Sequence, residues 1–347
     1  MSVRPIIIAG PCSVESREQL HETALALDAI PEVDMIRCGV WKPRTRPGGF
    51  EGLGETALRW IGELRQQHPS MQFCCEVAKP AHVELCEKYG IDALWIGART
   101  AGDPFSMSEL TEAMRGIRKT IMVKNPMSPD INAWIGAIER CLQIGVPKVV
   151  AVHRGFDVYN NLGYRNNPLW EIPMELRRRM PELPLICDPS HICGKGDLIA
   201  DMAQTALDFN FDGLMIEVHS NPAQALTDKA QQLTPAQLKA IVDRLVVKQE
   251  NDATVDELNY LRTQIDTVDK ELVKLIESRL SISRKIADVK RAHKMTTYQP
   301  KRWEAVLNKR LEMARQTGLS EEFVKELFEK LHSESVRVQE ESLKNGS

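Results

Sequence analysis

The chain has 347 residues, enough for two domains of ordinary size. Hydrophobic residues make up 43% and charged residues 27%, a composition too apolar for a disordered protein. The formal net charge is −3 and no basic block occurs, which argues against a nucleic-acid-binding protein. No run approaches the roughly 18 apolar residues that cross a membrane. Eight scattered cysteines without a signal peptide indicate reduced thiols in the cytoplasm.

The first part of the chain alternates short apolar runs with helical stretches. Eight runs are almost continuously apolar, as expected of parallel strands buried on both faces. They span residues 5–9, 35–39, 72–77, 93–97, 120–124, 148–153, 183–187 and 213–218. Eight strand–helix units in about 245 residues predict a (β/α)₈ TIM barrel. A doubly wound open sheet is the alternative.

After residue 249 glycine and proline nearly vanish and the pattern becomes helical. Apolar residues at steps of three and four predict one long helix, which begins at a capping pattern on Thr254 and ends near residue 292. Pro300 is placed to begin a second helix, and a third is expected over 321–341. We therefore predict a barrel at 1–247, a linker at 248–253 and an all-α three-helix domain at 254–347.

Polar side chains follow the carboxyl ends of the predicted strands, where the active sites of such barrels lie. A mixed set of potential metal ligands, Cys12, His191 and Glu217, stands there and suits Mn, Fe, Co or Zn ions better than Ca or Mg. Cations also gather at this rim and would repel one another unless phosphate or carboxylate groups bind there. The cations are Arg37, Lys42, Arg44, Arg99, Lys124 and Arg154.

Five short motifs resemble, in order, those of the short microbial 3-deoxy-D-arabino-heptulosonate 7-phosphate (DAHP) synthases over about residues 1–245. They are Gly10-Pro-Cys-Ser, Lys42-Pro-Arg-Thr, Gly97-Ala-Arg, Asp188-Pro-Ser-His and Ile216-Glu-Val-His. The resemblance implies a TIM barrel that condenses phosphoenolpyruvate with erythrose 4-phosphate. The 3-deoxy-manno-octulosonate 8-phosphate synthases, which use a longer sugar, are the rival. They have Lys-Ala-Asn-Arg where this chain has Lys-Pro-Arg-Thr.

The same resemblance implies roles for the rim residues. The ligands of one divalent metal ion would be Cys12, His191, Glu217 and Asp228. Arg99, Lys124 and Arg154 would bind the phosphate of phosphoenolpyruvate, Arg37 and Lys42 its carboxylate, and Arg44 and Thr45 the aldose phosphate. The metal would polarise the aldehyde oxygen as a Lewis acid. Lys42 is the candidate proton donor to that oxygen, and Glu76 is a candidate for positioning water.

The long predicted helix carries a second candidate anion site. Arg279 and Lys290 are 11 residues apart, about three turns, so they share one helix face and can bracket a small dianion. Arg262 lies 17 residues earlier, about 26 Å along the axis and on another face, so it cannot reach the same small ligand. Ser335 and Gln339 form an i, i+4 pair on the third helix.

This pattern resembles the all-α chorismate mutases over about residues 253–341. The resemblance implies rearrangement of chorismate to prephenate in an intertwined homodimer, in which Arg262 completes the site of the other protomer. The chorismate-binding residues would be Arg262, Arg279, Lys290, Arg302, Ser335 and Gln339. Lys290 and Gln339 would contact the breaking ether oxygen. The whole chain would then be a bifunctional enzyme of the shikimate pathway, which makes aromatic amino acids.

Two positions depart from the chorismate mutase pattern. Trp303 stands where the family commonly has Glu, and Gln299 stands where Asp is usual. The alternative is therefore that the helical domain is a dimerising regulator, which binds chorismate or prephenate and controls the barrel.

Overall fold

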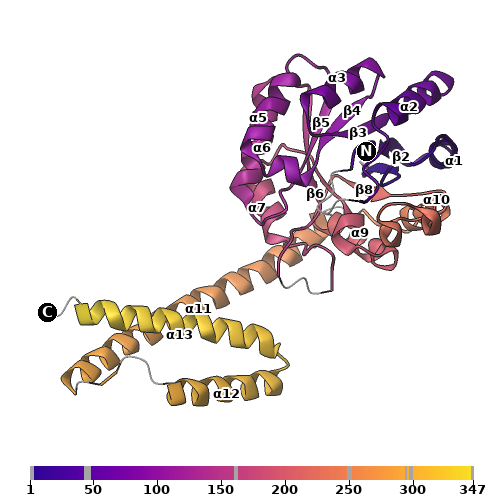
Figure 1. Ribbon diagram of the computed structural model, residues 1–347. Helices are drawn as coiled ribbons and strands as arrows, with labels where there is room; N and C mark the ends of the chain where they lie inside the picture. The colour runs from indigo at the N-terminus through magenta and orange to yellow at the C-terminus, as the bar shows by residue number, and fades with distance from the viewer. Residues whose placement is uncertain are drawn as a thin grey trace. The chain divides into compact units, whose positions relative to one another are not determined.

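The computed structural model describes residues 4–42, 48–159, 163–247, 252–293, 295–296 and 300–344. The chain divides into two compact units, Met1–Lys248 and Gln249–Ser347. The strands of the described residues all belong to the first unit, and the second unit is helical (Figure 1). Among the helices that the structure describes, none combines the length and the apolar character needed to cross a membrane.

Eight parallel strands close the first unit into a barrel, each beside the next in chain order. The strands are β1 (Ile6–Gly10), β2 (Val33–Cys38), β3 (Phe73–Val77), β4 (Ala93–Ile96), β5 (Thr120–Lys124), β6 (Lys148–His153), β7 (Leu185–Cys187) and β8 (Gly213–Glu217). The barrel closes where β8 pairs with β1, and this closure excludes the open-sheet alternative. The prediction of a TIM barrel is confirmed, and every strand lies within two residues of its predicted run.

Successive side chains of each strand alternate between the helical layer and the barrel interior. In β8, Leu214 and Ile216 belong to the large hydrophobic cluster under the helices, whereas Met215 belongs to the cluster inside the barrel. Trp95 is among the largest fully buried side chains and belongs to the same interior cluster. Glu217 is the next inward position at the carboxyl end of β8, so the same alternation that builds the core also points polar groups at the rim.

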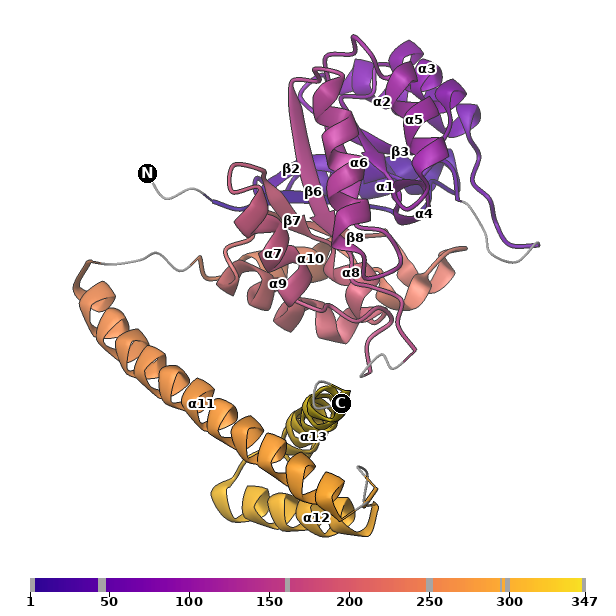
Figure 2. The same cartoon turned by 90° about the vertical axis from the view of Figure 1, so that its left-hand side faces the viewer.

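Helices cover the outside of the barrel (Figures 1 and 2). They are α1 (Arg17–Asp28), α2 (Glu55–Gln67), α3 (Pro80–Lys88), α4 (Ala98–Ala101), α5 (Pro104–Ala113), α6 (Ile131–Gln143), α7 (Glu171–Arg179), α8 (Pro189–Cys193), α9 (Ile199–Asp208) and α10 (Pro235–Val242). In α6, Trp134, Ile138 and Cys141 recur at steps of four and three and are buried against the barrel. Three short 3₁₀ helices, η1 (Gly196–Leu198), η2 (Pro222–Gln224) and η3 (Lys229–Gln231), complete this unit.

The second unit consists of α11 (Asp252–Ala292), α12 (Pro300–Thr317) and α13 (Glu321–Lys344). α13 packs on both α11 and α12. The three predicted helices are present, and Pro300 is the first residue of α12. α11 begins at Asp252, two residues before the predicted start at Thr254. The capping pattern on Thr254 therefore does not mark the N-terminus of this helix. α13 continues three residues beyond the predicted 341.

Candidate active sites

Inward-facing polar side chains from five strands meet at the carboxyl-terminal rim of the barrel. Each continues the inner series of its strand, and all are buried: Arg37, Lys124, Arg154, Asp188 and Glu217. The Arg37 guanidinium crosses to β8, where its Nη2 donates to Glu217 Oε1 at 3.0 Å. The Lys124 ammonium donates to Asp188 Oδ2 at 2.7 Å. The rim predicted from strand ends is therefore a connected group of buried charges.

Three of the four predicted metal ligands lie together at this rim. The donor atoms of Cys12, Glu217 and Asp228 are all within 4.8 Å of one another. The Cys12 Sγ lies 3.3 Å from Asp228 Oδ2. The fourth predicted ligand, His191, is placed with Nε2 3.7 Å from Glu217 Oε1. Thiol, imidazole and carboxylate groups this close together form a donor set suited to a borderline divalent ion.

Backbone geometry brings two of these ligands into place. Gly39, just after β2, lies against Cys12: a Cβ at this position would sit 1.9 Å from the Cys12 carbonyl oxygen. Only glycine permits such a close approach of the two segments. Asp228 has a left-handed backbone with φ of +45°, and non-glycine residues rarely adopt it. Strain of this kind concentrates at functional sites.

The charge around the Cys12 thiol bears on whether these residues can bind a cation. Burial, together with the nearby carboxylates of Glu217 and Asp228, raises the pKa of Cys12 to about 12 against the opposing charges of Lys42 and Arg37. A metal ligand must be a thiolate, and a divalent cation supplies the positive charge that stabilises one. Burial also opposes ionisation of Asp228, but Arg165 and Lys42 outweigh it and lower the pKa of that carboxyl. The donor set thus fits a cation.

Lys42 lies within electrostatic reach of the predicted metal ligands. Burial alone would lower the pKa of Lys42, but Cys12 and Glu217 outweigh this effect and raise it. The side chain therefore remains protonated, as a proton donor must be before it acts. Arg44 and Thr45, predicted to bind the aldose phosphate, lie outside the described residues.

A second group of cations surrounds Arg154. Burial, together with the charges of Arg165 and Arg99, lowers the pKa of Arg154 to about 10 against the opposing effect of Asp188. Arg154 Nη1 donates to Asn166 Oδ1 at 2.7 Å, which fixes its direction. Guanidinium groups that repel one another in this way are stabilised when an anion lies between them. The charges of Arg99 and Arg154 are thus close enough to affect each other, and their joint role in binding phosphate stays a prediction.

Arg165 is a rim residue that the sequence did not single out. Its Nη1 lies 3.1 Å from Asp228 Oδ1, and it also donates to Gln231 Oε1 at 2.5 Å. Gln231 in turn donates to Glu217 Oε2 at 2.7 Å. Arg165 lies in the connection between β6 and α7, where no strand end predicts a position. The only signal is a basic residue in the long connection between β6 and β7.

Glu76 is held near the rim by β4. Trp95 Nε1 donates to Glu76 Oε2 at 3.1 Å. Gly97 allows the other oxygen to approach closely, because a Cβ on Gly97 would sit 2.2 Å from Glu76 Oε1. A role for Glu76 in positioning water stays a prediction.

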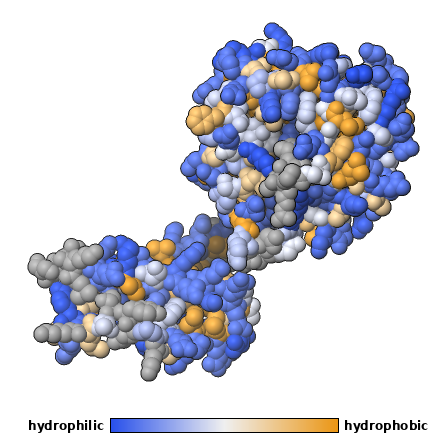
Figure 3. All heavy atoms as spheres, viewed as in Figure 1, coloured by the Kyte–Doolittle hydropathy of each residue, from blue (hydrophilic) through white to orange (hydrophobic). Residues whose placement is uncertain are grey.

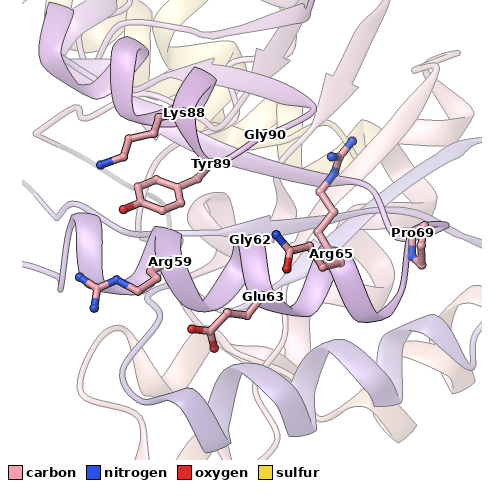
Figure 4. Close-up of a pocket in the computed structure, with 9 residues that line it drawn as sticks. Arg59, Gly62, Glu63, Arg65, Pro69, Lys88, Tyr89 and Gly90 are labelled. Carbon is pink, nitrogen blue, oxygen red and sulfur yellow. The ribbon is translucent and has the colours of Figure 1, made fainter.

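A hollow of about 470 Å³ lies elsewhere, on the outside of the barrel between α2 and α3 (Figure 4). Three of its polar side chains have partners: Lys88 and Tyr89 donate to Glu55, and Arg65 donates to Asp92. None of the described rim residues lines it: the lining residues are Arg59, Gly62, Glu63, Arg65, Gln66, Pro69, Lys88, Tyr89 and Gly90. This hollow therefore has no part in the rim chemistry.

In the helical unit, two pairs of predicted site residues meet between α11 and α13. Arg279 Nη1 donates to Ser335 Oγ and to the carbonyl oxygen of Leu331, the latter at 2.9 Å. Lys290 Nζ donates to Gln339 Oε1 at 3.2 Å. Ser335 and Gln339 are buried, at 5% and 7% exposure. The two cations thus share one face of α11, and that face meets the polar pair of α13.

An aromatic stack stands beside these cations. The Trp303 and His332 rings stack 4.1 Å apart and nearly parallel, at 13°. Burial lowers the pKa of His332, and the charges of Arg279 and Lys290 add to the effect, which places the imidazole close to both. Position 303, where the chorismate mutases commonly have Glu, thus holds one ring of an aromatic stack.

The remaining predicted residues of the helical site are less closely placed. Arg302, on α12, and Arg262, on α11, have exposed side chains. Gln299 lies outside the described residues. Within one chain the structure brings together Arg279, Lys290, Ser335 and Gln339.

Both units of the chain are similar to known protein families. The model of the DAHP synthetase I family matches residues 2–263, and that of chorismate mutase type II matches residues 261–340. A phospho-2-dehydro-3-deoxyheptonate aldolase of Thermotoga maritima is 30% identical over 239 residues, which cover 69% of this chain and 68% of that protein. A crystal structure of this DAHP synthase superposes with a TM-score of 0.63 at 31% identity, covering 70% of this chain and 68% of the other.

Other relatives are named as phosphooctonate aldolases. The 2-dehydro-3-deoxyphosphooctonate aldolase of Syntrophotalea carbinolica is 24% identical over 262 residues, covering 69% of this chain and 89% of that protein. That of Wolinella succinogenes is 25% identical over 281 residues, covering 71% and 99%. Fold, rim and family matches agree. The chain belongs to the DAHP synthetase I family and carries a chorismate mutase type II domain in its helical unit, which makes it a bifunctional enzyme of aromatic biosynthesis.

Proposed function

We propose that the barrel condenses phosphoenolpyruvate with erythrose 4-phosphate to give DAHP and phosphate, and that it requires one divalent ion, Mn, Fe, Co or Zn. The observation that carries this proposal is the rim, where the donor atoms of Cys12, Glu217 and Asp228 cluster beside buried cations. The Thermotoga maritima relative, whose name states this synthase activity, adds support. Cys12, His191, Glu217 and Asp228 would hold the ion, which as a Lewis acid polarises the aldehyde oxygen.

The cations of the rim bind and orient the two phosphorylated substrates. Arg99, Lys124 and Arg154 take the phosphate of phosphoenolpyruvate, and Arg37 and Lys42 take its carboxylate. Arg44 and Thr45 take the phosphate of the aldose. Because each anionic end is fixed, C3 of the enol ester is held against the aldehyde carbon, and the bimolecular step becomes effectively intramolecular.

Proton transfer at the rim is assigned to Lys42. As the bond forms between C3 and the aldehyde carbon, the aldehyde oxygen gains an electron pair and takes a proton from the Lys42 ammonium. Water then adds at C2 and returns one proton to the Lys42 amine. The bond between C2 and the phosphate oxygen breaks, the remaining hydroxyl proton passes to the departing phosphate, and C2 becomes a ketone carbon. The buried guanidinium groups stabilise the negative charge at each stage.

A phosphate-release assay tests the barrel proposal. Purified protein receives both substrates and one divalent ion at a time, with and without a chelator. We expect phosphate release only with the ion, and loss of it in Cys12→Ala. Full activity in the presence of chelator would contradict the metal requirement.

We propose further that the helical unit rearranges chorismate to prephenate in a homodimer. Arg279 and Lys290 would bracket the dianion, Ser335 and Arg302 would add contacts, and Lys290 with Gln339 would meet the breaking ether oxygen. The reaction is unimolecular, so compaction of the substrate and cations at that oxygen are sufficient. The observation that carries this is the pairing of Lys290 with Gln339 and of Arg279 with Ser335.

The dimer is supported by the surface of α11. Seven apolar side chains at steps of three, four and seven form one stripe along this helix, each between 43% and 66% exposed: Ile265, Val268, Leu272, Leu275, Ile282, Ile286 and Val289. Figure 3 shows apolar side chains among the polar ones on the surface of this unit. A stripe of this kind is typical of an interface. In the dimer Arg262 would enter the partner's site. It is too far along α11 to reach the site of its own chain.

A regulatory role for the helical unit is the second candidate. The observation that favours it is the Trp303–His332 stack beside Arg279, where the family commonly has a carboxylate. Addition of prephenate to the condensation assay separates the two: a change in condensation rate supports regulation, and loss of chorismate measured in parallel supports catalysis. An unchanged condensation rate would contradict regulation by prephenate.

We infer a cytoplasmic location for the enzyme. All eight cysteines are free and buried, and reduced thiols are usual in that compartment.

A further inference from the structure

Asp188 is a buried carboxylate to which no role in binding or catalysis has been assigned. It follows β7 directly, continues the inward series after Ile186, and is fully buried at 0% exposure. A carboxylate this deep is stable only when it is paired and hydrogen-bonded. Its partners therefore indicate its function.

One oxygen of Asp188 lies close to a nitrogen of Lys124 and to a nitrogen of His191. Lys124 Nζ lies 2.7 Å and His191 Nδ1 lies 2.8 Å from the same Oδ2. Arg37 Nη1 is 3.8 Å from this oxygen. The other oxygen, Oδ1, accepts from the backbone N–H of His191 at 3.1 Å and so caps α8.

The contact at Nδ1 decides which nitrogen of His191 is free. An imidazole that donates through Nδ1 carries its lone pair on Nε2. Nε2 is the nitrogen that faces the metal cluster, 3.7 Å from Glu217 Oε1. A carboxylate behind a metal-binding histidine fixes both the tautomer and the direction of the ring.

The contact with Lys124 reaches the anion site. The Lys124 ammonium also lies over the Trp95 ring, 5.9 Å from its centre, and the Arg37 guanidinium lies over the same ring at 5.1 Å. Two buried cations this close need a nearby negative charge when no substrate is present. Asp188 supplies this negative charge and thereby fixes the position of the Lys124 ammonium.

We propose that Asp188 is a positioning residue that holds the imidazole of His191 for the metal and the ammonium of Lys124 for the phosphate of phosphoenolpyruvate at the same time. The metal site and the phosphate site are then linked through Asp188. A displacement of His191 shifts Lys124, and a displacement of Lys124 shifts His191. This inference rests on the proposed function of the barrel.

Asparagine cannot replace Asp188 without losing one of these contacts. The amide has the same shape but a single oxygen. If that oxygen stays with Lys124 and His191, the N-cap of α8 is lost. If it keeps the N-cap, an NH₂ group faces two donors. The variant Asp188→Asn therefore disturbs the linked arrangement with little change in volume.

The test measures binding rather than turnover. Full-length Asp188→Asn, freed of metal, is titrated with Co²⁺ and followed by its visible absorption, and phosphoenolpyruvate binding is measured separately by calorimetry. We expect Co²⁺ affinity to fall about 10- to 100-fold, an altered Co²⁺ spectrum, and weaker phosphoenolpyruvate binding. The matched control is Asp130→Asn, because Asp130 also caps a helix, α6, through Asn132 N and Ala133 N. The control should leave both affinities unchanged.

Each outcome has a consequence for Asp188. Wild-type Co²⁺ affinity and spectrum in a folded Asp188→Asn protein would overturn the inference. If this variant does not fold, nitrogen NMR of histidine in the metal-free wild-type protein decides, with His191 identified by its loss in His191→Gln. A proton on Nδ1 supports the inference, and a proton on Nε2 overturns it. If wild-type protein binds no Co²⁺, the metal site itself is wrong.

Discussion

At the residue scale, Gly39 carries the most direct link between backbone packing and the metal site. A Cβ there would lie 1.9 Å from the Cys12 carbonyl oxygen, so Gly39→Ala must force the segments of Gly39 and Cys12 apart. We expect a loss of about 1–3 kcal/mol in the free energy of unfolding, as is usual for overpacking, together with weaker Co²⁺ binding. Urea denaturation and metal titration measure the two effects.

Gly136→Ala is the matched control for this prediction. Gly136 lies within α6, where the nearest group to an added Cβ is the flexible end of Arg140 at 3.4 Å. Alanine in a helix should leave stability unchanged or raise it by about 0.5–1 kcal/mol. Equal stability and metal affinity in both variants would show that Gly39 does not constrain Cys12.

Some site residues could be predicted from the sequence, and others could not. Arg37, Lys124 and Glu217 end strands whose apolar alternation is readable, so the rule that barrel sites lie at strand ends finds them. Asp228 was assigned only through the family resemblance, because its left-handed turn leaves no periodic signal. Arg165 and Asp188 acquire their significance from partners far away in sequence, which the tertiary structure alone reveals.

At the scale of elements, α11 presents a testable surface. Leu272 lies in its apolar stripe at 50% exposure. If the stripe forms the dimer interface, Leu272→Glu places a charge in it and should give a monomer by light scattering. Chorismate turnover should fall with it, because Arg262 would no longer reach a partner's site.

The neighbouring residue provides the control. Val273 is 67% exposed, one position and about 100° away from the stripe. Val273→Glu adds the same charge to the same helix and should remain dimeric. A dimer in both variants, with undiminished mutase activity, would contradict the assignment of the stripe.

The long elements could be predicted more fully than the short ones. Continuous apolar runs located all eight strands, since a parallel strand buried on both faces has few polar positions. α4 and α8 have only four and five residues, too few for a helical period to repeat, and neither was predicted. The start of α11 was misplaced because a capping pattern is shared by many sequences that do not begin a helix.

At the scale of the whole molecule, two chemistries occur in separate units of one chain. Lys290→Gln should reduce chorismate turnover about 100-fold or more, the loss usual when a group that stabilises developing charge on oxygen is removed. Its condensation rate should equal that of the wild type. Cys12→Ala should show the reverse pattern. Both rates are measured on the same preparations, and loss of both activities in either variant would contradict separate sites.

The proposed function of the barrel depends on one divalent ion that binds among Cys12, His191, Glu217 and Asp228 at the rim. Anomalous X-ray scattering from crystals grown with Mn²⁺ and phosphoenolpyruvate measures its position directly. We expect one strong anomalous peak per barrel, within bonding distance of the Cys12 sulfur, with the phosphate of phosphoenolpyruvate beside Arg99, Lys124 and Arg154. A peak at any other place, or phosphoenolpyruvate bound without the ion at this rim, would contradict it.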